Sequence, residues 1–264
     1  MSYKGNLKAA GFSYLGSCSQ SMKLRLSEEN GVLTFGIYLA PANMSGYEVC
    51  PNSKWCREFC LNGSGHNKME ILAGKNRIQI ARIKKTRLFF ENRELFMVIL
   101  IHEIMRWKKY AEEHGLGFAI RLNCTSDISP EEFVYNGKNI LEIFPNVQFY
   151  DYTKVYSRIN LLGKYPNYDL TYSYSGHNER CCKKFLEKGG KVAVVFASKE
   201  MPEKFWGFPV TNGNLYDMRY LDPEGNVIFL HYHATANDYK NGEFVMPDTP
   251  FVVKPTDPRI SWAS

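Results

Sequence analysis

Short apolar segments recur at intervals of about 20 to 35 residues from residue 118 onward, and this recurrence most constrains the fold that the chain can adopt. The segments are rich in β-branched and aromatic residues, as buried strands are. Helix-compatible stretches such as residues 139–144 and 179–188 separate them. Strands and helices in alternation predict βα units and a mostly parallel sheet. The predicted strands are residues 32–39, 118–122, 147–150, 169–174, 192–197 and 227–232, and two helices over about 70–90 and 93–114 follow the first of them.

The number of strands predicts the kind of sheet. A closed eight-stranded barrel usually needs ~250 residues, whereas about six strands are spread over the 264 residues of this chain. We therefore expect an α/β fold with a partial or irregular TIM-barrel-like, mostly parallel sheet. No linker divides the chain, so residues 1–264 are predicted to form a single domain, with an N-terminal segment at 1–31 and an extended C-terminal tail at 248–264.

Composition and charge exclude several classes of protein. Hydrophobic residues make up 44% of the chain, which is enough for a core. The longest apolar run, Leu95 to Ile101, is far shorter than the ~20 residues that span a bilayer, so we expect no membrane segment. The first residues lack the pattern of a secretory signal, which predicts a cytoplasmic protein. A net charge of +6 permits a nucleic-acid or phosphate partner without requiring one.

Three cysteines lie close together directly after the first predicted strand. Cys50, Cys56 and Cys60 fall within eleven residues, whereas the other four of the seven cysteines are dispersed. An odd number of cysteines in a chain without an export signal disfavours a disulfide framework. Three thiolates on one loop can bind a [4Fe–4S] cluster and leave its fourth iron open, whereas structural zinc takes a fourth protein ligand, for which His66 is the candidate. Buried free thiols are the third interpretation.

The same loop resembles the cluster loop of radical S-adenosylmethionine enzymes. The resemblance rests on Phe59, which directly precedes the last cysteine, and on the place of the loop after the first strand of an α/β array. Five and three residues separate the cysteines here, where that family usually has three and two. The resemblance implies a [4Fe–4S] cluster with S-adenosylmethionine as a further cofactor, although the chain has no clear glycine-rich motif for the latter.

A larger part of the chain resembles an uncharacterised family of bacteriophage proteins related to the gene product 88 domain. The matching motifs are Tyr38-Leu39-Ala40-Pro41, the cysteine loop, Arg121-Leu122-Asn123 and the segment from Asp217 to Pro223, and together they cover roughly residues 33–225. That family has no established activity. The resemblance implies a phage origin, the host cytoplasm as the location, and a shared site rather than a particular reaction.

Polar residues gather where the predicted strands end. Ligands of α/β sheets bind at the carboxyl ends of the strands, so these side chains are predicted to bind a substrate or cofactor or to transfer a proton. For two carboxylates a structural role is the alternative: Asp127 would cap a helix beginning near Pro130, and Asp151 would lie in a solvated turn. The predicted binding residues are Arg121, Asn123, Ser126, Tyr152, Lys154, Ser173 and Ser175, and the predicted catalytic residues are Asp127 and Asp151.

A basic stretch suggests a second kind of partner. Residues 75–87 contain six basic residues and no acidic one, which is typical of a segment that contacts phosphates. Helical geometry places these residues on different sides, so a solvated charged face and an inward orientation toward the cysteine loop are the alternatives. The predicted nucleic-acid contacts are Arg77, Arg82, Lys84, Lys85 and Arg87.

Two functional hypotheses result. In the first, the chain is a phage-encoded protein that binds a [4Fe–4S] cluster through Cys50, Cys56 and Cys60 and acts as a divergent radical enzyme on a small or nucleotide substrate. In the second, zinc held by these cysteines and His66 stabilises a nucleic-acid-binding or host-takeover protein without catalysis. The sequence leaves open whether the chain is an enzyme.

Overall fold

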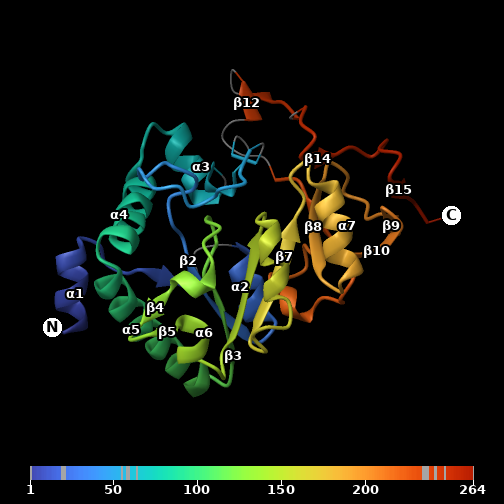
Figure 1. Cartoon of the computed structure of the whole chain (residues 1–264). Helices are drawn as coiled ribbons and strands as arrows, with labels where there is room; N and C mark the ends of the chain where they lie inside the picture. Colours follow the sequence, from blue (N-terminus) through green and yellow to red (C-terminus); the bar gives the residue numbers. More distant parts are fainter. Residues whose placement is uncertain are drawn as a thin grey trace.

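The computed structural model describes residues 2–18, 22–54, 56–57, 60–63, 65–233, 238–240, 243–246 and 248–263. Its main element is one eleven-stranded sheet, in which six central strands run parallel and neighbour one another in chain order (Figure 1). The six strands are β2 (Val32–Ile37), β3 (Gly117–Arg121), β6 (Gln148–Thr153), β7 (Tyr168–Ser173), β8 (Lys191–Phe196) and β11 (Val227–His231).

Shorter strands extend this sheet at both edges. β1 (Gly16–Ser17) pairs antiparallel with β2, and at the other edge β10 (Phe208–Asn212) runs parallel to β11. Beyond β10 lie the antiparallel strands β9 (Lys204–Phe205) and β15 (Ile260–Ser261). Among the described residues no ladder joins the β1 edge to the β15 edge, so the sheet is open. Two small antiparallel pairs lie outside it: β4 (Val134–Tyr135) with β5 (Lys138–Asn139), and β12 (Tyr239–Lys240) with β13 (Glu243–Phe244).

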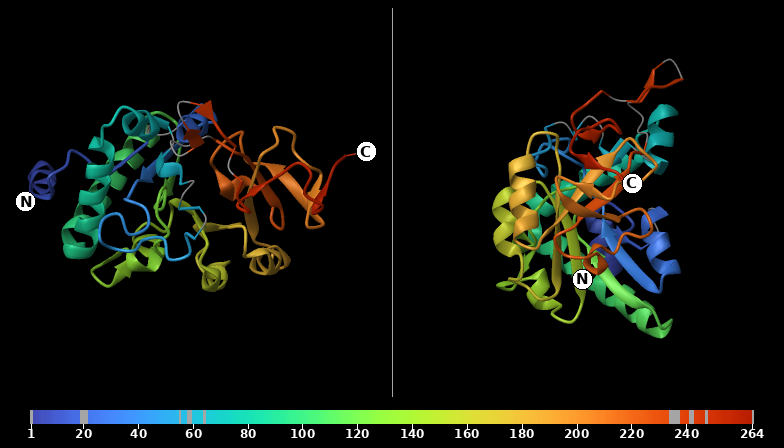
Figure 2. Two further views of the ribbon diagram at one scale, coloured as in Figure 1. Left: turned by 90° about the horizontal axis from the view of Figure 1, so that it is seen from above. Right: turned by 90° about the vertical axis from the view of Figure 1, so that its right-hand side faces the viewer.

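Helices cover one face of the sheet along most of its width. α5 (Arg93–Glu113) packs on β2 and β3, and α7 (Glu179–Glu187) packs on β7 and β8 (Figure 2). α2 (Met22–Glu29) lies against β2 from the opposite face. The remaining α-helices of the described chain are α1 (Tyr3–Ala10), α3 (Gly65–Leu72), α4 (Arg77–Glu91) and α6 (Ile140–Ile143). Short 3-10 helices lie at η1 (Leu61–Gly63), η2 (Pro130–Glu132), η3 (Tyr156–Leu161) and η4 (Arg219–Leu221). No described helix is long and apolar enough to cross a membrane.

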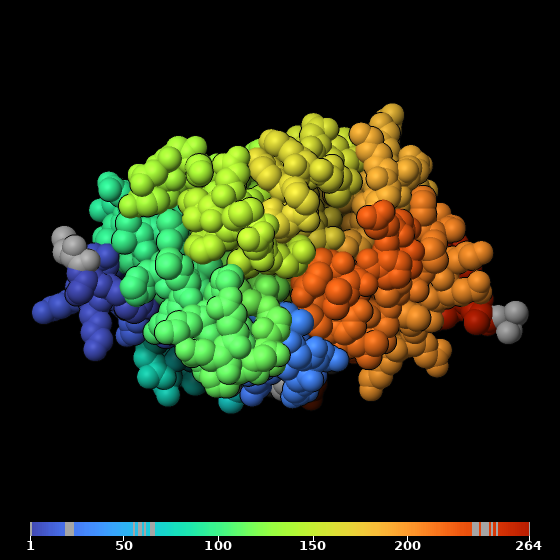
Figure 3. All heavy atoms as spheres, turned by 90° about the horizontal axis from the view of Figure 1, so that it is seen from below, coloured from blue at the N-terminus to red at the C-terminus, as the bar shows by residue number. Residues whose placement is uncertain are grey.

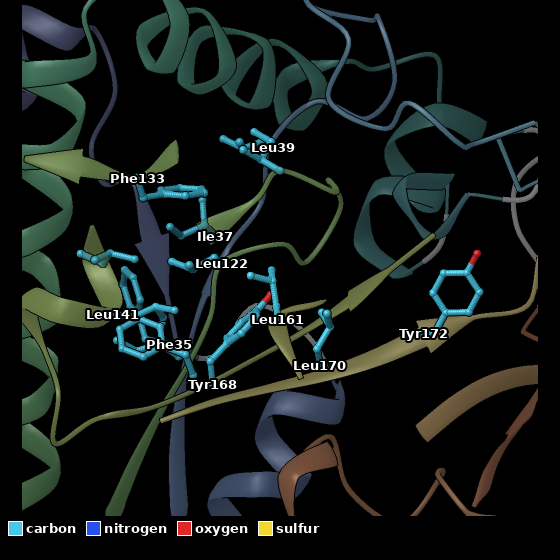
Figure 4. Close-up of a cluster of buried hydrophobic side chains, with 14 of the residues drawn as sticks. Phe35, Ile37, Leu39, Leu122, Phe133, Leu141, Leu161, Tyr168, Leu170 and Tyr172 are labelled. Atoms are coloured by element: carbon cyan, nitrogen blue, oxygen red, sulfur yellow. The ribbon is translucent and has the colours of Figure 1, made fainter. Parts of the chain in front are cut away.

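The core lies between the parallel strands and the covering helices. Every second residue of a strand faces the same side, and on this side the residues are apolar and fully buried. Figure 4 shows part of the cluster, with side chains from β2 and β7 and from the segments that follow β2 and β3. Its labelled members are Phe35, Ile37, Leu39, Leu122, Phe133, Leu141, Leu161, Tyr168, Leu170 and Tyr172.

The opposite face of the same strands is polar. Thr34 of β2, Tyr150 of β6 and Thr171 of β7 point away from the apolar core and are nevertheless buried. They are covered by α2 and by the segment 213–222, which meet where the backbone N–H of Asp217 donates to the Ser27 hydroxyl over 3.4 Å. Figure 3 shows this meeting from below, with the segment 213–226 (orange) against the segment near residues 22–31 (blue).

The predicted strands are all confirmed, with ends shifted by at most three residues. The coarser prediction of an α/β fold with a mostly parallel sheet is therefore correct, and closure into a barrel is not found. The single helix predicted over 70–90 is two helices, because α3 ends at Leu72 and α4 begins at Arg77. Gly74 lies between them with φ of +68°, a left-handed conformation that glycine adopts without strain and that ends a helix.

The C-terminal tail contributes two short strands to the sheet. β14 (Val252–Val253) pairs in parallel with β8, and both valines are buried, while β15 pairs with β9. The N-terminal segment is folded as well, since it forms α1, β1 and α2. Both ends of the chain thus contribute strands to the main sheet.

One buried carboxylate fixes the N-terminal segment to the helical layer. Glu103 on α5 accepts hydrogen bonds of 2.8 Å from the hydroxyl of Tyr3 and from the backbone N–H groups of Leu15 and Gly16. It is fully buried, so each of these bonds replaces water that the carboxylate has lost. The 11–17 loop therefore has a defined position beside α5.

Replacement of Glu103 by Gln should destabilise the fold. The amide NH₂ would face backbone N–H groups that now donate to a carboxylate, so at least one buried donor would lose its acceptor, at a cost of about 1–3 kcal/mol. Chemical denaturation measures this loss. Glu112→Gln on the same helix is the matched control, since Glu112 is exposed and forms a surface ion pair with Lys108. Its replacement should change the unfolding free energy by less than ~0.5 kcal/mol. Equal effects of the two changes would contradict the anchoring role.

Candidate functional site at the carboxyl ends of the strands

The loop that carries the three cysteines leaves β2 and crosses the carboxyl ends of the neighbouring strands. The Sγ of Cys50 lies 3.8 Å from the carbonyl oxygen of Thr125, which follows β3. The amide of Asn52 donates to the carbonyl of Lys154, directly after β6, over 3.1 Å. The backbone N–H of Asp127 donates to the Val49 carbonyl over 2.7 Å. The cysteine loop is therefore tied to the loops after β3 and β6.

The three thiols of this loop are close enough to influence one another's ionisation. Burial is the main cause that raises the pKa of the Cys50 thiol to about 12, and negative charge on Cys60 and Cys56 contributes to this rise. Burial also raises the pKa of Cys60, with a smaller contribution from Cys56. All three are free cysteines and partly buried. In the described part of the chain no three His, Cys, Asp or Glu side chains are already arranged around a single ion, and the side chain of His66 lies outside the described residues.

Two cations face the cysteine loop. The positive charges of Lys154 and Arg82 both lower the pKa of Cys60, against the effect of burial. Arg82 extends from α4 toward the loop, where it donates to the side-chain oxygen of Asn62 and lies 5.3 Å from the centre of the Tyr38 ring. Arg82 therefore points inward toward the cysteine loop, which was one of the alternatives for the basic stretch at residues 75–87. Thiolates on this loop would be balanced by positive charge.

Asn123 and Ser126, which follow β3, form one buried network with Asp151 of β6. The carboxylate of Asp151 accepts from the backbone N–H of Asn123 over 2.7 Å and from its side-chain amide over 3.0 Å. The side-chain oxygen of Asn123 in turn accepts from the Ser126 hydroxyl and from the Ile128 N–H, each over 2.8 Å. These bonds fix the course of the loop 123–128. Asp151 is only 1% exposed and faces this loop rather than solvent.

Asp127 is held by an arginine that the sequence did not single out. Its carboxylate pairs with Arg158 of η3 at 2.5 Å and accepts from the backbone N–H of Lys154 over 2.9 Å. The predicted capping role is not observed, because the short turn that begins at Pro130 is preceded by Ser129 and has no side-chain cap. The pair joins the loop after β3 to the loop after β6.

Arg121 and Tyr152 lie together on the polar face of the sheet. The Arg121 guanidinium forms an ion pair of 2.9 Å with Asp217 and lies 4.7 Å from the centre of the Tyr152 ring. Tyr150 donates to the same Asp217 carboxylate over 2.9 Å. Arg219 is fully buried nearby and pairs with Asp222 at 3.0 Å. These side chains connect the sheet to the segment 213–222 that covers it.

The two predicted serines serve a turn rather than the cysteine loop. The amide of Asn178 donates to the carbonyl of Ser173 over 2.9 Å, and its side-chain oxygen accepts from the backbone N–H of Ser175 over 2.8 Å. Among the described residues no side-chain contact joins either serine to Lys154 or to the cysteines. Those residues lie with Asn123, Ser126, Asp127 and Asp151 around the loops after β3 and β6.

Several of the residues that take part in these networks were not named individually from the sequence. Asp217, Arg219 and Asp222 lie in the segment from Asp217 to Pro223 that carries part of the family resemblance, so the sequence held a signal for them. Asn52 lies within the cysteine loop and Thr125 directly before Ser126, so the sequence held a signal for these two as well. Arg158 had none, because its contact with Asp127 joins parts of the chain that only the folded sheet brings together.

A comparison with models of protein families agrees with the motifs that the sequence analysis identified. The family model for Gene product 88 matches residues 15–243, which is most of the chain. The chain belongs to the Gene product 88 family. The match confirms the family suggested by the sequence motifs and supports a phage-type protein. No curated protein and no solved structure matches this Gene product 88 protein, so the comparisons do not support a similarity to radical S-adenosylmethionine enzymes.

Asp151 should make the stability of the protein depend on pH. Burial raises its pKa from 3.8 to about 7, against the effect of the bonds from Asn123. The folded state thus favours the protonated carboxyl, so the contribution is fully present below pH ~4 and is lost as the pH rises toward 7, at no more than about 1.4 kcal/mol per pH unit. Denaturation at several pH values should show this slope in the wild type and a smaller slope in Asp151→Asn. Identical slopes would contradict the assignment.

Proposed function

We propose that this Gene product 88 protein binds a [4Fe–4S] cluster through Cys50, Cys56 and Cys60 and acts on a small or nucleotide substrate at the carboxyl ends of its parallel strands. The observation that carries the proposal is the position of the cysteine loop, which is tied to the loops after β3 and β6 by Cys50, Asn52 and Asp127. Ligands of parallel α/β sheets bind at this edge.

The donor set and its surroundings suit an iron–sulfur cluster. A cluster held by three thiolates leaves one iron open to a small ligand and can pass single electrons. Thiolates must lose their protons to bind metal, and burial makes that loss costly for Cys50 and Cys60. Arg82 and Lys154 offset part of that cost with positive charge. Structural zinc is the alternative, and it takes four protein ligands, so His66 would have to complete the site.

The order of the sheet supports the same interpretation. Parallel strands that follow one another in chain order, with helices on one face, are the arrangement of a (β/α)8 barrel, and six such strands form part of one. We interpret the sheet as a partial barrel whose first strand, β2, leads directly into the cysteine loop. This is the placement that the resemblance to radical S-adenosylmethionine enzymes implies.

Lys154 is the residue best placed to bind a substrate beside the loop. Its ammonium influences Cys60, and in the described part of the chain no carboxylate forms an ion pair with it. It lies 5.9 Å from the centre of the Phe251 ring, so an apolar surface is next to the charge. A carboxylate or phosphate of the substrate would pair with it. Asn123, Asp151 and the Asp127–Arg158 pair would position the loops on either side rather than contact the reacting atoms.

Serine variants of the cysteines test the ligand set. Reconstitution with iron and sulfide under anaerobic conditions should give the wild type the broad visible absorption of iron-bound thiolates, and Cys50→Ser, Cys56→Ser and Cys60→Ser should each lose most of it. Cys181→Ser is the matched control, since Cys181 is a free, partly buried cysteine on α7, and it should retain the absorption. Unchanged iron content in the triple variant would contradict the proposal.

His66→Ala separates the cluster from zinc. A cluster with three cysteine ligands does not use the imidazole, so iron binding should survive this change. A zinc site would lose a ligand, and zinc affinity should fall by at least about tenfold, as it does for lesser changes around metal sites. Retained iron together with unchanged stability supports the cluster, whereas zinc binding that depends on His66 supports the alternative.

A further inference from the structure

A second site lies away from the cysteine loop, where the N-terminal segment meets α4 and α5. α1 lies beside these two helices (Figure 1), and the loop 11–17 continues from it over their surface. Two hollows of about 320 and 360 Å³ flank this loop and share Ser13 and Tyr14 in their walls. They therefore lie next to each other with Ser13 and Tyr14 as their shared wall, and we call the two hollows together the N-terminal groove.

The walls of the N-terminal groove combine aromatic rings with positive charge. The first half is lined by Phe12 and Tyr14 together with Arg77, Lys84 and Lys85 of α4. The second half is lined by Tyr3, Trp107 and Tyr14 together with Lys4 and Arg106. No acidic residue of the described chain lines either half. A surface of this composition attracts an anion and offers flat faces for stacking.

Lys85 is the most deeply buried cation of the groove. It is only 5% exposed, and its ammonium lies 4.5 Å from the centre of the Tyr14 ring and 6.0 Å from that of Phe12. Burial lowers its pKa to about 8, and the negative charge of Glu103 acts in the opposite direction. In the described part of the chain no carboxylate forms an ion pair with this ammonium, so a bound anion would supply the direct ion pair that it does not make within the fold.

The other cations of the groove differ in how free they are to bind an anionic ligand. Lys84 is exposed at the rim, and among the described residues its ammonium reaches the carbonyl of Gly11, at 3.5 Å. Arg106 lies 5.1 Å from the centre of the Trp107 ring, a position in which both groups can face a ligand. Arg77 is already paired with Glu70 at 3.0 Å, so it adds less charge.

The rest of the basic stretch does not belong to this site. Arg82 faces the cysteine loop, as described above, and Arg87 donates to the carbonyl of Ser45 over 3.1 Å. Of the five residues that the sequence suggests as nucleic-acid contacts, Arg77, Lys84 and Lys85 therefore share one hollow. Their spacing along the helix explains this, because residues 77, 81, 84 and 85 project from one side.

We infer that the N-terminal groove binds single-stranded nucleic acid, with backbone phosphates at Lys84, Lys85 and Arg106 and bases against Tyr14 and Trp107. Single-strand binding sites elsewhere combine a basic path with aromatic rings on which successive bases stack, and such contacts are tolerant of sequence. Tyr14 is 43% exposed between the two halves, where one base could stack on it. The rigid loop provides the platform, because Glu103 fixes Leu15 and Gly16. The inference is independent of any cluster on the cysteine loop.

Binding of a fluorescently labelled oligothymidylate of about twelve nucleotides tests this inference by anisotropy. Lys84→Gln and Tyr14→Leu should each weaken binding about fivefold or more, the lower end of what one stacked base contributes. Lys184→Gln on α7 is the matched control, because Lys184 is also exposed on a helix and lies far from the groove. It should change affinity by less than twofold. Affinity of the wild type should also fall steeply with salt.

Lys85→Met separates a ligand contact from a structural role. The methionine keeps the apolar stem and removes the unpaired charge, so the melting temperature should stay the same or rise while oligonucleotide affinity falls. A large drop in the melting temperature would overturn the assignment of Lys85 as a ligand contact.

Competition identifies the form of the ligand. Unlabelled oligothymidylate should displace the probe at far lower phosphate concentration than thymidine monophosphate or inorganic phosphate, and a duplex of the same length should compete less well. Equal competition by the free nucleotide, tighter binding of the duplex, or equal losses in Lys84→Gln and Lys184→Gln would each overturn the inference.

Discussion

Parallel pairing of β2, β3, β6, β7, β8 and β11 is the constraint on which the rest of this structure depends. Parallel strands in chain order bring every loop that follows a strand to the same edge of the sheet. The cysteine loop after β2 therefore meets the loops after β3 and β6, although these segments are about 75 to 102 residues apart. The same pairing buries both faces of the strands, so the polar face also needs a cover.

That cover combines apolar packing with buried charge, since Leu24 and Met218 are buried in it beside the ion pairs. Arg121 pairs with Asp217, and Arg219 pairs with Asp222, in surroundings from which water is largely excluded. Removal of one member of such a pair leaves an uncompensated charge, so these residues specify how the segment 213–222 must lie. The polar face thus connects the C-terminal half of the chain to the strands that carry the proposed site. The N-terminal groove is anchored in a comparable way, through the buried Glu103.

Local composition was sufficient to predict the strands but not the contacts between distant residues. The six parallel strands are evident from runs of β-branched and aromatic residues, and the gathering of Asn123, Ser126 and Asp151 follows from their positions after strands. Gly74, which divides the predicted long helix, also had a visible signal. By contrast, the pair of Arg121 and Asp217 spans 96 residues, and the bond from Leu15 to Glu103 spans 88. The periodicity of apolar residues in the sequence does not predict contacts of that kind, because the two residues come together only when the sheet has formed.

The central claim is that the cysteine loop holds an iron–sulfur cluster, and the composition of the protein purified without oxygen tests it most directly. Iron, acid-labile sulfide and zinc should be measured together with the visible absorption spectrum. The account predicts about four iron and four sulfide per chain with the absorption of iron-bound thiolates. Colourless protein with neither iron nor sulfide, after reconstitution as well as before it, would contradict the account, and stoichiometric zinc in that protein would assign the three cysteines to a structural site instead.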